Sequence, residues 1–176
     1  MKKFDNWESV EEKGNSTQKI LPPGGYVGKI TAVTDNPDKE YLRIEWDICE
    51  GEYTGNGASC VERNGFLPSS NKFVRSYKES ALGFFKGFIS SVEQSNPNWK
   101  WAFDEKQLVG KLVGVILGEE EYRKNDESIG TRLVVKRTIP VDDVRKGNFK
   151  IPDKTLLKEE YKPVSFTTVD DGELPF

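Results

Sequence analysis

A strict alternation of apolar and charged side chains constrains the fold of this chain more than any other sequence feature. In the segment "YLRIEWDI", which spans residues 41–48, the apolar positions are Leu42, Ile44, Trp46 and Ile48. The residues between them are all charged: Arg43, Glu45 and Asp47. A period of two is typical of a half-buried β-strand. We therefore expect a strand with Trp46 in the core and a charged face directed toward water or a ligand.

Further strand patterns and one clear helix follow. The turn-forming "LPPGG" leads into a predicted strand over residues 26–33, and a less regular third strand is expected around residues 58–63. Two more strands are expected over residues 111–122 and 130–139. Between the third and the fourth predicted strand, Ser76 and Glu79 are spaced as a capping box. The helix after it should bury one face: Leu82, Phe85, Ile89 and Val92. A short helical turn is predicted for residues 104–109.

The expected fold class is mainly β, with the element order three strands, a helix and two strands. This is the order of the OB-fold, a five-stranded Greek-key barrel with a helix between strands three and four. We expect residues 1–20 to form an N-terminal arm and residues 21–150 to form the OB-fold domain. No periodicity follows Pro140, so residues 151–176 are expected to form an extended or disordered tail that is flexible and acidic.

Composition excludes several classes of function. The chain has no histidine and only two cysteines, which excludes Cys-based zinc sites and histidine base catalysis. It has neither an apolar run long enough to span a bilayer nor a signal segment, so we expect a cytoplasmic protein without a membrane partner. The net charge is −3, and the body is close to neutral. A polyanionic partner would therefore be held by a local groove rather than by a global field.

Carboxylate clusters raise the alternative of a metal-dependent nuclease. The runs at residues 119–121 and 142–143 contain oxygen ligands suited to magnesium. Adjacent strand residues point to opposite faces, however, so such runs rarely converge on one ion. No phosphate-binding loop, nucleophile elbow or dinucleotide motif is present. We expect a protein without enzymatic activity, cofactor or metal, with the nuclease as the weaker alternative.

Aromatic and basic residues are interleaved, as expected of a surface that binds single strands by base stacking and phosphate contacts. The candidate nucleic-acid-binding residues are Tyr41, Arg43, Arg63, Phe66, Lys72, Phe73, Arg75, Tyr77, Arg132 and Lys136. Lys136 is preferred over Arg137 because neighbouring strand residues face opposite sides. Phe73 and Tyr77 are equally consistent with packing at the helix start. The aromatic residues of "NWKWAF" are expected to cover the core, with a stacking platform as the alternative.

The last eight residues, "VDDGELPF", combine acids with an apolar tip. A partner with a basic rim around an apolar pocket could bind such a tip. The candidate partner-binding residues are Asp170, Asp171, Glu173, Leu174, Pro175 and Phe176. The alternative is that Phe176 docks on its own domain. The tip resembles that of bacterial single-stranded DNA-binding proteins, which end in acids followed by Ile-Pro-Phe and use this tip to recruit replication and repair proteins. Gly172 departs from that acidic run.

Four segments of the body carry a second resemblance: "LPPGGYVGKI", "YLRIEWDICEGEYTG", "ALGFFKGFI" and "LVGKLVGVIL". In these segments the chain is similar to a family of small phage replication-module proteins of formally unknown function. The resemblance covers most of residues 20–140. Members of the family are suspected single-strand binders. The resemblance implies an OB-fold and a phage or prophage source, and hence a location in the bacterial host cell.

The leading hypothesis is a phage single-stranded DNA-binding protein. Its barrel would coat or protect DNA, and its tip would recruit replication or recombination proteins. The main alternative is an OB-fold adaptor that contacts proteins only. A homodimer is compatible with the arm of residues 1–20 and with an unpaired strand edge, although neither feature requires one.

Overall fold

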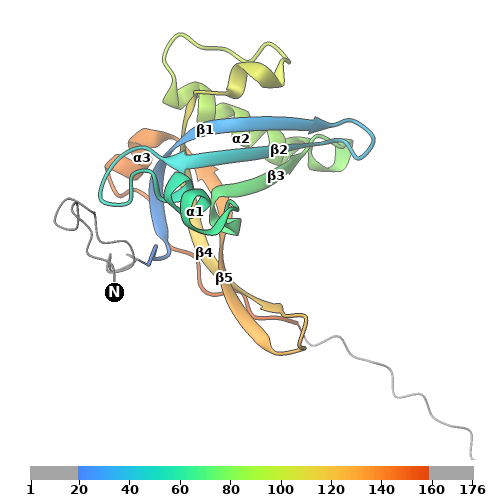
Figure 1. Cartoon of the computed structure of the whole chain (residues 1–176). Helices are drawn as coiled ribbons and strands as arrows, with labels where there is room; N and C mark the ends of the chain where they lie inside the picture. The colour runs from blue at the N-terminus through green and yellow to red at the C-terminus, as the bar shows by residue number, and fades with distance from the viewer. Residues whose placement is uncertain (1–19, 159–176) are drawn as a thin grey trace, which may run out of the picture.

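A curved antiparallel sheet forms the centre of the molecule (Figure 1). The computed structural model describes residues 20–158. The α-helices, 3-10 helices (η) and strands of this part are β1 (Gly24–Asn36), β2 (Tyr41–Ile48), α1 (Asn56–Asn64), η2 (Ser69–Asn71), β3 (Lys72–Ser76), η3 (Glu79–Ala81), α2 (Leu82–Ser95), η4 (Glu105–Leu108), β4 (Leu112–Arg123), β5 (Ile129–Ile139) and α3 (Val141–Arg145). The expected mainly β fold, with five strands and a helix between the third and fourth, is confirmed.

The strand order is β3-β2-β1-β4-β5, and the sheet remains open. β1 joins its two halves, because residues 24–29 pair with β4 and residues 28–36 pair with β2. A register shift between Ile30 and Ala32 marks a β-bulge, a feature that bends a strand. β5 returns to the vicinity of β3, but no backbone ladder joins the two strands in residues 20–158. At this seam the hydroxyl of Ser69 donates a hydrogen bond to the carbonyl of Leu133 at 3.0 Å.

The core lies between the sheet and α2. Ile44 and Trp46 from β2 are fully buried together with Phe88 and Val92 from α2, so the predicted core position of Trp46 is confirmed. Burying such large side chains supplies most of the driving force for folding. Gly28 on β1 makes room for the Trp46 ring, because a Cβ atom at this position would collide with the indole. Glycine is therefore required at position 28.

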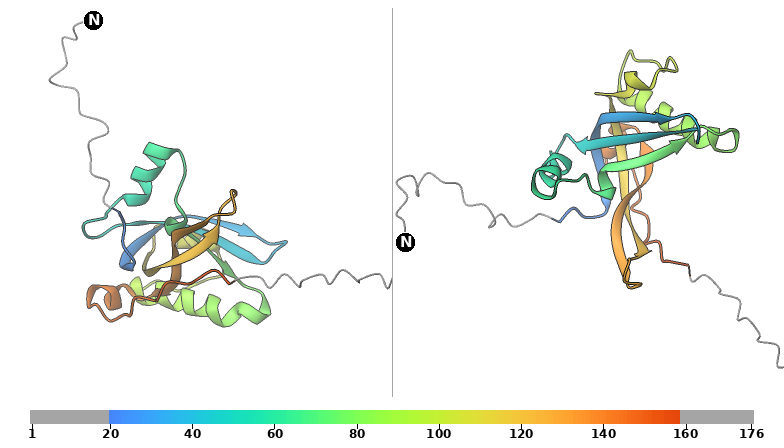
Figure 2. Two further views of the ribbon diagram at one scale, coloured as in Figure 1. Left: turned by 90° about the horizontal axis from the view of Figure 1, so that it is seen from below. Right: turned by 45° about the vertical axis from the view of Figure 1, so that its right-hand side comes forward.

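The helices lie on opposite sides of the strands. Seen from below, α1 lies on one side, and α2 and α3 lie on the other (Figure 2). The predicted short helical turn is present as η4, where the Asp104 side chain accepts a hydrogen bond from the Lys106 amide. None of the helices in residues 20–158 is long and apolar enough to cross a membrane.

The expected third strand around residues 58–63 is wrong. This stretch is α1, and the third strand is β3, at residues 72–76. The helix is bounded by Gly55 and Gly65, which both have a positive φ. Its first amides are bound by a carboxylate from another element, because Asp47 of β2 accepts hydrogen bonds from Gly57 N and Ala58 N at 2.8 and 2.9 Å. A cap supplied from a distant strand leaves no local signal in the sequence.

The predicted capping box at the start of α2 is also wrong. The Ser76 hydroxyl instead accepts a hydrogen bond from the Lys78 amide, and η3 lies between this turn and α2. Ala81 occupies the N-cap and provides no side-chain cap. The predicted buried face is only partly correct, because Leu82 is 48% exposed whereas Ile89 and Val92 are buried.

The segment after β5 is more ordered than its lack of periodicity suggests. α3 forms directly after Pro140, Phe149 then lies against Gly25 of β1, and residues 152–157 run against β4. Thr155 makes a parallel bridge with Glu120, and Leu157 N donates to the Glu121 carboxylate at 3.2 Å. Residues 1–19 of the expected arm, and the predicted partner-binding residues 170–176, lie outside the described residues.

Candidate nucleic-acid interface

The polar side of β2 and β3 brings together three of the predicted binding residues. Residues directly opposite one another in an antiparallel pair share a face. Because Tyr41 pairs with Ser76, Arg43 with Val74 and Glu45 with Lys72, these side chains lie on the side of the sheet away from the core. We call Tyr41, Arg43, Lys72 and Val74 the outer strand face.

The outer strand face presents positive charge beside apolar surface. Arg43 and Lys72 are exposed, and neither forms a salt bridge with any carboxylate in residues 20–158. Val74 is 49% exposed. Tyr41 is half-buried, and its hydroxyl accepts a hydrogen bond from Asn36 Nδ2 at 3.4 Å. Free cations next to half-exposed rings and methyl groups suit a phosphate backbone with unstacked bases.

A groove of about 380 Å3 follows the open seam of the sheet. We call it the seam groove, and its lining comes from β3, α2, β5 and the turn before α2: Val74, Arg75, Ser76, Ala81, Gly83, Phe84, Gly87, Phe88, Lys136, Arg137 and Thr138. Gly83 and Gly87 lie about one helical turn apart, and a Cβ atom at either position would meet nothing within 4 Å. Their missing side chains leave this side of α2 open. Val74 belongs to both the groove and the outer strand face, so the two surfaces meet at β3.

Arg75 is the charged centre of the seam groove. Its guanidinium lies 4.7 Å from the centre of the Phe73 ring, and Nη1 donates to the Val74 carbonyl at 3.1 Å. Burial lowers the pKa of Arg75, although an arginine remains protonated at neutral pH. No carboxylate of the described residues pairs with it. A partly desolvated cation without a counter-charge favours the binding of an anion.

Lys136 and Arg137 both line the seam groove, so the expectation that only Lys136 faces it is wrong. Ile116 pairs with Arg137 and Leu117 with Val135, which makes Lys136 the extra residue of a β-bulge. A bulge breaks the alternation of side-chain directions on which the expectation relied. The Lys136 ammonium is bound by Glu120 at 3.2 Å and by the Thr155 hydroxyl at 2.9 Å. Arg137 is exposed and has no such acidic partner in residues 20–158.

Arg132 lies on the β4–β5 hairpin, where it forms a salt bridge with Glu120. Its Nη2 is 2.7 Å from Glu120 Oε1, and its guanidinium lies over the Tyr122 ring. Burial opposes ionisation of Glu120, but the hydrogen bonds from Arg132 and Lys136 outweigh it and lower the pKa of this carboxyl. The residues Glu120, Arg132 and Lys136 form what we call the hairpin ion cluster. Glu120 and Arg132 do not line the seam groove, whereas Lys136 lines it together with Val74 of the outer strand face.

The remaining predicted residues divide between the core and α1. Phe73 is only 8% exposed and packs edge-to-face on Phe88, so its ring belongs to the core. Tyr77 packs on Phe85 and donates from its hydroxyl to Asp35 at 2.9 Å. Both contacts fit the alternative of packing at the helix start. At the end of α1, Arg63 and Phe66 are exposed, and Arg63 Nε donates to the Ser59 carbonyl at 3.1 Å.

Sequence reasoning missed Phe84 and Arg137. Phe84 is 81% exposed although it follows the pattern of an apolar helix. Its neighbour Phe85 packs against the core, and no local signal separates the two rings, because adjacent helix residues such as Phe88 and Ile89 can both be buried. The aromatic residues of "NWKWAF" continue a series of ring contacts that starts at Phe85. The ring centre of Trp101 lies 6.3 Å from that of Phe85 and 6.1 Å from that of Phe103. Trp99 and Trp101 cover the core as expected, whereas Phe103 is 89% exposed.

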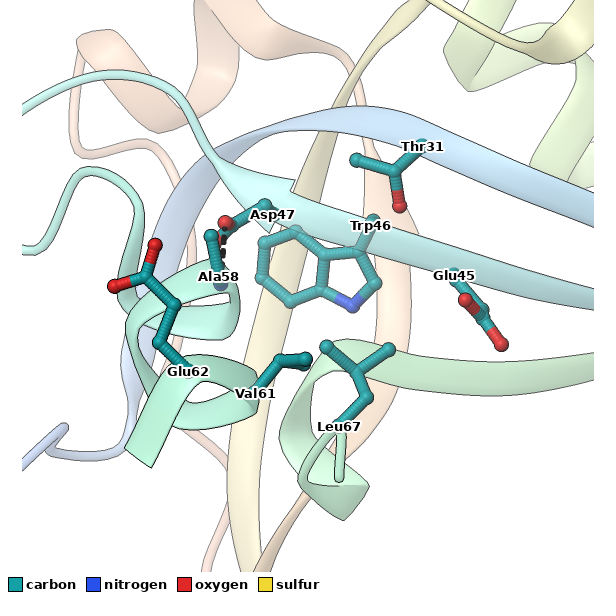
Figure 3. A pocket seen from close by; sticks show the side chains of 8 residues that line it. All are labelled: Thr31, Glu45, Trp46, Asp47, Ala58, Val61, Glu62 and Leu67. Carbon is teal, nitrogen blue, oxygen red and sulfur yellow. Dashed lines mark hydrogen bonds between the residues drawn. The ribbon is translucent and has the colours of Figure 1, made fainter. Parts of the chain in front are cut away.

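A second pocket, of about 390 Å3, lies between α1 and β2 (Figure 3). We call it the α1 pocket, and it is lined by Thr31, Glu45, Trp46, Asp47, Ala58, Val61, Glu62 and Leu67. Glu45 and Asp47 share a strand side with Arg43, so α1 and its pocket lie over one end of the outer strand face. The indole of Trp46 faces the pocket, and its buried Nε1 has no hydrogen-bond partner among the described residues.

The carboxylate runs do not assemble a metal site in residues 20–158, where no group of three potential ligands could hold an ion. Glu120 is held by Arg132 and Lys136, and Glu121 pairs with Lys154 at 3.1 Å.

The comparisons with known proteins give no independent indication of function, because no family model matches the chain and no curated protein is significantly similar to it.

Proposed function

We propose that the protein binds single-stranded DNA along a path that crosses the outer strand face and turns over β3 into the seam groove. The observation that carries the proposal is a set of cations without acidic partners in the described residues on both sides of β3: Arg43, Lys72, Arg75 and Arg137. The strand order and the return of β5 toward β3 agree with an OB-type barrel, a fold that binds oligonucleotides in many proteins.

Each part of this path has a separate role. Arg43, Lys72 and Arg137 are solvated and attract phosphates over a distance, which speeds association and makes binding sensitive to salt. Arg75 is partly desolvated and holds one phosphate more tightly. The exposed ring of Phe84 at the groove provides a stacking surface for a base. These interactions need unpaired, splayed bases and a flexible backbone, which favours a single strand over a duplex.

The resemblance to phage replication-module proteins extends the proposal to the biological role of the protein. The protein would protect single-stranded DNA during phage replication or recombination in the bacterial cytoplasm. Its tip at Asp170, Asp171, Glu173, Leu174, Pro175 and Phe176 would recruit a replication or recombination protein. The acids steer the tip toward a basic rim, and Leu174 and Phe176 fill an apolar pocket of that partner.

A direct titration tests DNA binding. A fluorescently labelled thymidine oligomer of about 15 nucleotides, near the upper site size of one OB-fold, is titrated with the protein at low and high salt. We expect fluorescence anisotropy to rise at low salt and affinity to fall steeply with salt. A duplex of the same length serves as the control and should bind more weakly. Absence of binding at low salt overturns the proposal.

The second candidate function is a protein adaptor without DNA binding. The near-neutral charge of the chain and the exposed apolar side chains Val74 and Phe84 favour it. An adaptor predicts that a partner is captured by the full chain while the thymidine titration stays flat. Deleting residues 170–176 then removes capture.

A further inference from the structure

The α1 pocket combines the features of a site for a planar polar ligand. Its volume of about 390 Å3 lies within the range of small-molecule sites. Ala58, Val61 and Leu67 give it apolar walls, and the indole of Trp46 lies along it (Figure 3). Apolar walls around a flat ring system suit a flat ligand that stacks or slides between them.

An unused hydrogen-bond donor lies in the buried wall of the pocket. Trp46 is fully buried, and its Nε1 has no acceptor among residues 20–158. Buried indole N–H groups normally have a partner, because a buried donor without an acceptor is destabilising. In Figure 3 the nitrogen side of the indole is directed toward Leu67, so a ligand that moves this flexible side chain reaches the donor. A carbonyl oxygen is the natural acceptor.

The carboxylates of the pocket are not equivalent. Asp47 is already engaged, since Oδ1 accepts from Ile48 N and Gly57 N and Oδ2 accepts from Ala58 N. Glu45 and Glu62 lie on opposite sides of the indole, and neither forms a salt bridge with another described residue. Glu45 is half-buried and belongs to β2, whereas Glu62 is exposed on α1. Glu45 is therefore the acceptor available to a ligand in the pocket.

From this arrangement we infer that the α1 pocket receives one base of the bound strand and selects guanine. Guanine presents two donors, N1–H and the N2 amino group, beside one acceptor, O6. The donors match the Glu45 carboxylate, and the acceptor matches Trp46 Nε1. Thymine offers Glu45 one donor that is flanked by two carbonyl oxygens, so it fits less well. Carboxylates in other complexes accept hydrogen bonds from base amino groups in the same way.

Continuity with the DNA path favours a base over other ligands. Glu45 pairs directly with Lys72, which belongs to the outer strand face. A strand whose phosphates bind Arg43 and Lys72 therefore passes the mouth of the pocket. Its negative backbone stays with these cations, and only a neutral base enters between the carboxylates. The inference rests on the proposed function, since it assigns one more interaction to the same bound strand.

Matched oligomers test the inference on the full chain. Three labelled thymidine oligomers are compared: one unmodified, one with a single central guanine, and one with hypoxanthine at that position, which lacks only the N2 amino group. We expect the guanine oligomer to bind roughly tenfold more tightly than the unmodified one, equal to about 1.4 kcal/mol. The hypoxanthine oligomer should lose most of this gain.

Two variants locate the preference. Glu45→Gln removes the carboxylate and should bring the guanine and thymidine affinities together, while both oligomers still bind. Glu127→Gln changes an exposed carboxylate that does not line the pocket, and as the matched control it should keep the preference. Equal binding of all three oligomers by the unmodified protein, or a preference that survives Glu45→Gln, overturns the inference and leaves the proposed function intact. The inference is also wrong for the full chain if the guanine preference appears only in a variant that lacks residues 1–19. Failure of every oligomer to bind at low salt overturns both.

Discussion

Two regions of the sheet carry clusters of basic residues, and they differ in what surrounds the charges. In the hairpin ion cluster, Arg132 and Lys136 share the carboxylate of Glu120, and the Thr155 hydroxyl also binds Lys136. Around β3, Arg43 and Arg75 have no acidic partner in the described part of the chain. The first arrangement stabilises the molecule, whereas the second leaves charge available for a ligand.

The difference between the two regions explains why the number of basic residues is a poor guide to a binding surface. Paired cations have already exchanged water for a protein partner, and an incoming phosphate would have to compete with that partner. Unpaired cations carry no such penalty. Substitutions in the two regions should therefore have different consequences, which range from a large loss of DNA affinity to a small change in acid stability.

The largest effect is expected from removing the free charges around β3. The triple substitution Arg43→Gln, Arg75→Gln and Arg137→Gln should weaken binding of the thymidine oligomer roughly 100-fold, because it removes three charge-assisted hydrogen-bonding groups for phosphate. The slope of the logarithm of the binding constant against the logarithm of the salt concentration should also become shallower, by about 0.7 for each phosphate that is no longer neutralised. Both quantities are measured by anisotropy titration at several salt concentrations. The control Lys146→Gln changes an exposed cation beyond α3 and should have little effect. Equal losses of affinity in both variants would indicate a general charge effect instead of a defined path.

A smaller effect is expected from the exposed ring at the seam groove. Phe84→Ala should lower affinity for the oligomer about tenfold, the usual contribution of one stacked base. Thermal stability should stay nearly unchanged, because Phe84 is 81% exposed. Phe103→Ala removes another highly exposed ring, at 89%, that does not line the groove. If Phe103→Ala weakens binding as much as Phe84→Ala, the path extends to the aromatic residues of "NWKWAF".

Breaking the hairpin ion cluster should change stability and spare DNA binding. Glu120→Gln leaves Arg132 and Lys136 without their shared counter-charge and should lower the free energy of unfolding by about 1 kcal/mol. Affinity for the oligomer should stay the same or rise slightly, because two cations are released. Urea unfolding and the anisotropy titration measure the two quantities on one preparation. A large loss of affinity in this variant would place the hairpin on the DNA path.

The smallest effect concerns pH. Hydrogen bonds from Arg132 and Lys136 overcome the burial of Glu120 and lower its pKa below the ordinary value of 4.5. The pKa of Glu121 is lowered by hydrogen bonds from Lys154 and from the Leu157 amide. A lowered carboxyl pKa contributes stability that is complete above the ordinary pKa and is lost as pH falls through the lowered value.

The unfolding free energy should therefore be constant near neutral pH and decline below about pH 4.5. Glu120→Gln should show a weaker decline, because one of the responsible groups is gone. Urea denaturation across this pH range measures the difference. Identical pH profiles for the two proteins would mean that Glu120 does not contribute to the acid sensitivity.

The sequence predicted those elements whose signals are local. Alternation over residues 41–48 predicted β2 and the buried Trp46, and alternation over residues 130–139 predicted β5. The apolar segment that begins at Leu112 predicted β4. Helix α1 escaped because its cap, Asp47, comes from a strand and reaches the helix only after folding. The roles of Arg132 and Lys136 escaped for a related reason, since pairing with Glu120 depends on the hairpin register and on a bulge.

The proposed binding surface was only partly predictable from the sequence. Arg43 could be assigned because alternation over residues 41–48 places it away from the core. Lys72 was predicted from its basic and aromatic neighbours in an expected loop, and the structure places it on β3. Phe73 could not be separated from them by sequence alone, because a ring beside a basic loop looks the same whether it stacks on DNA or on Phe88. The seam groove is a tertiary feature, formed where two glycines of α2 meet the gap between β3 and β5.

We expect DNA to bind around β3 and along the seam groove, and not along residues 119–132 of the β4–β5 hairpin, which contain Glu120 and Arg132. The most direct test follows the backbone amide signals of the isotope-labelled full chain by NMR while the thymidine oligomer is added at low salt. The account predicts shifts concentrated at Arg43, Lys72, Val74, Arg75 and Phe84, with the amides of residues 119–132 nearly unchanged. Shifts confined to residues 119–132, or no shifts at saturating oligomer, would contradict it.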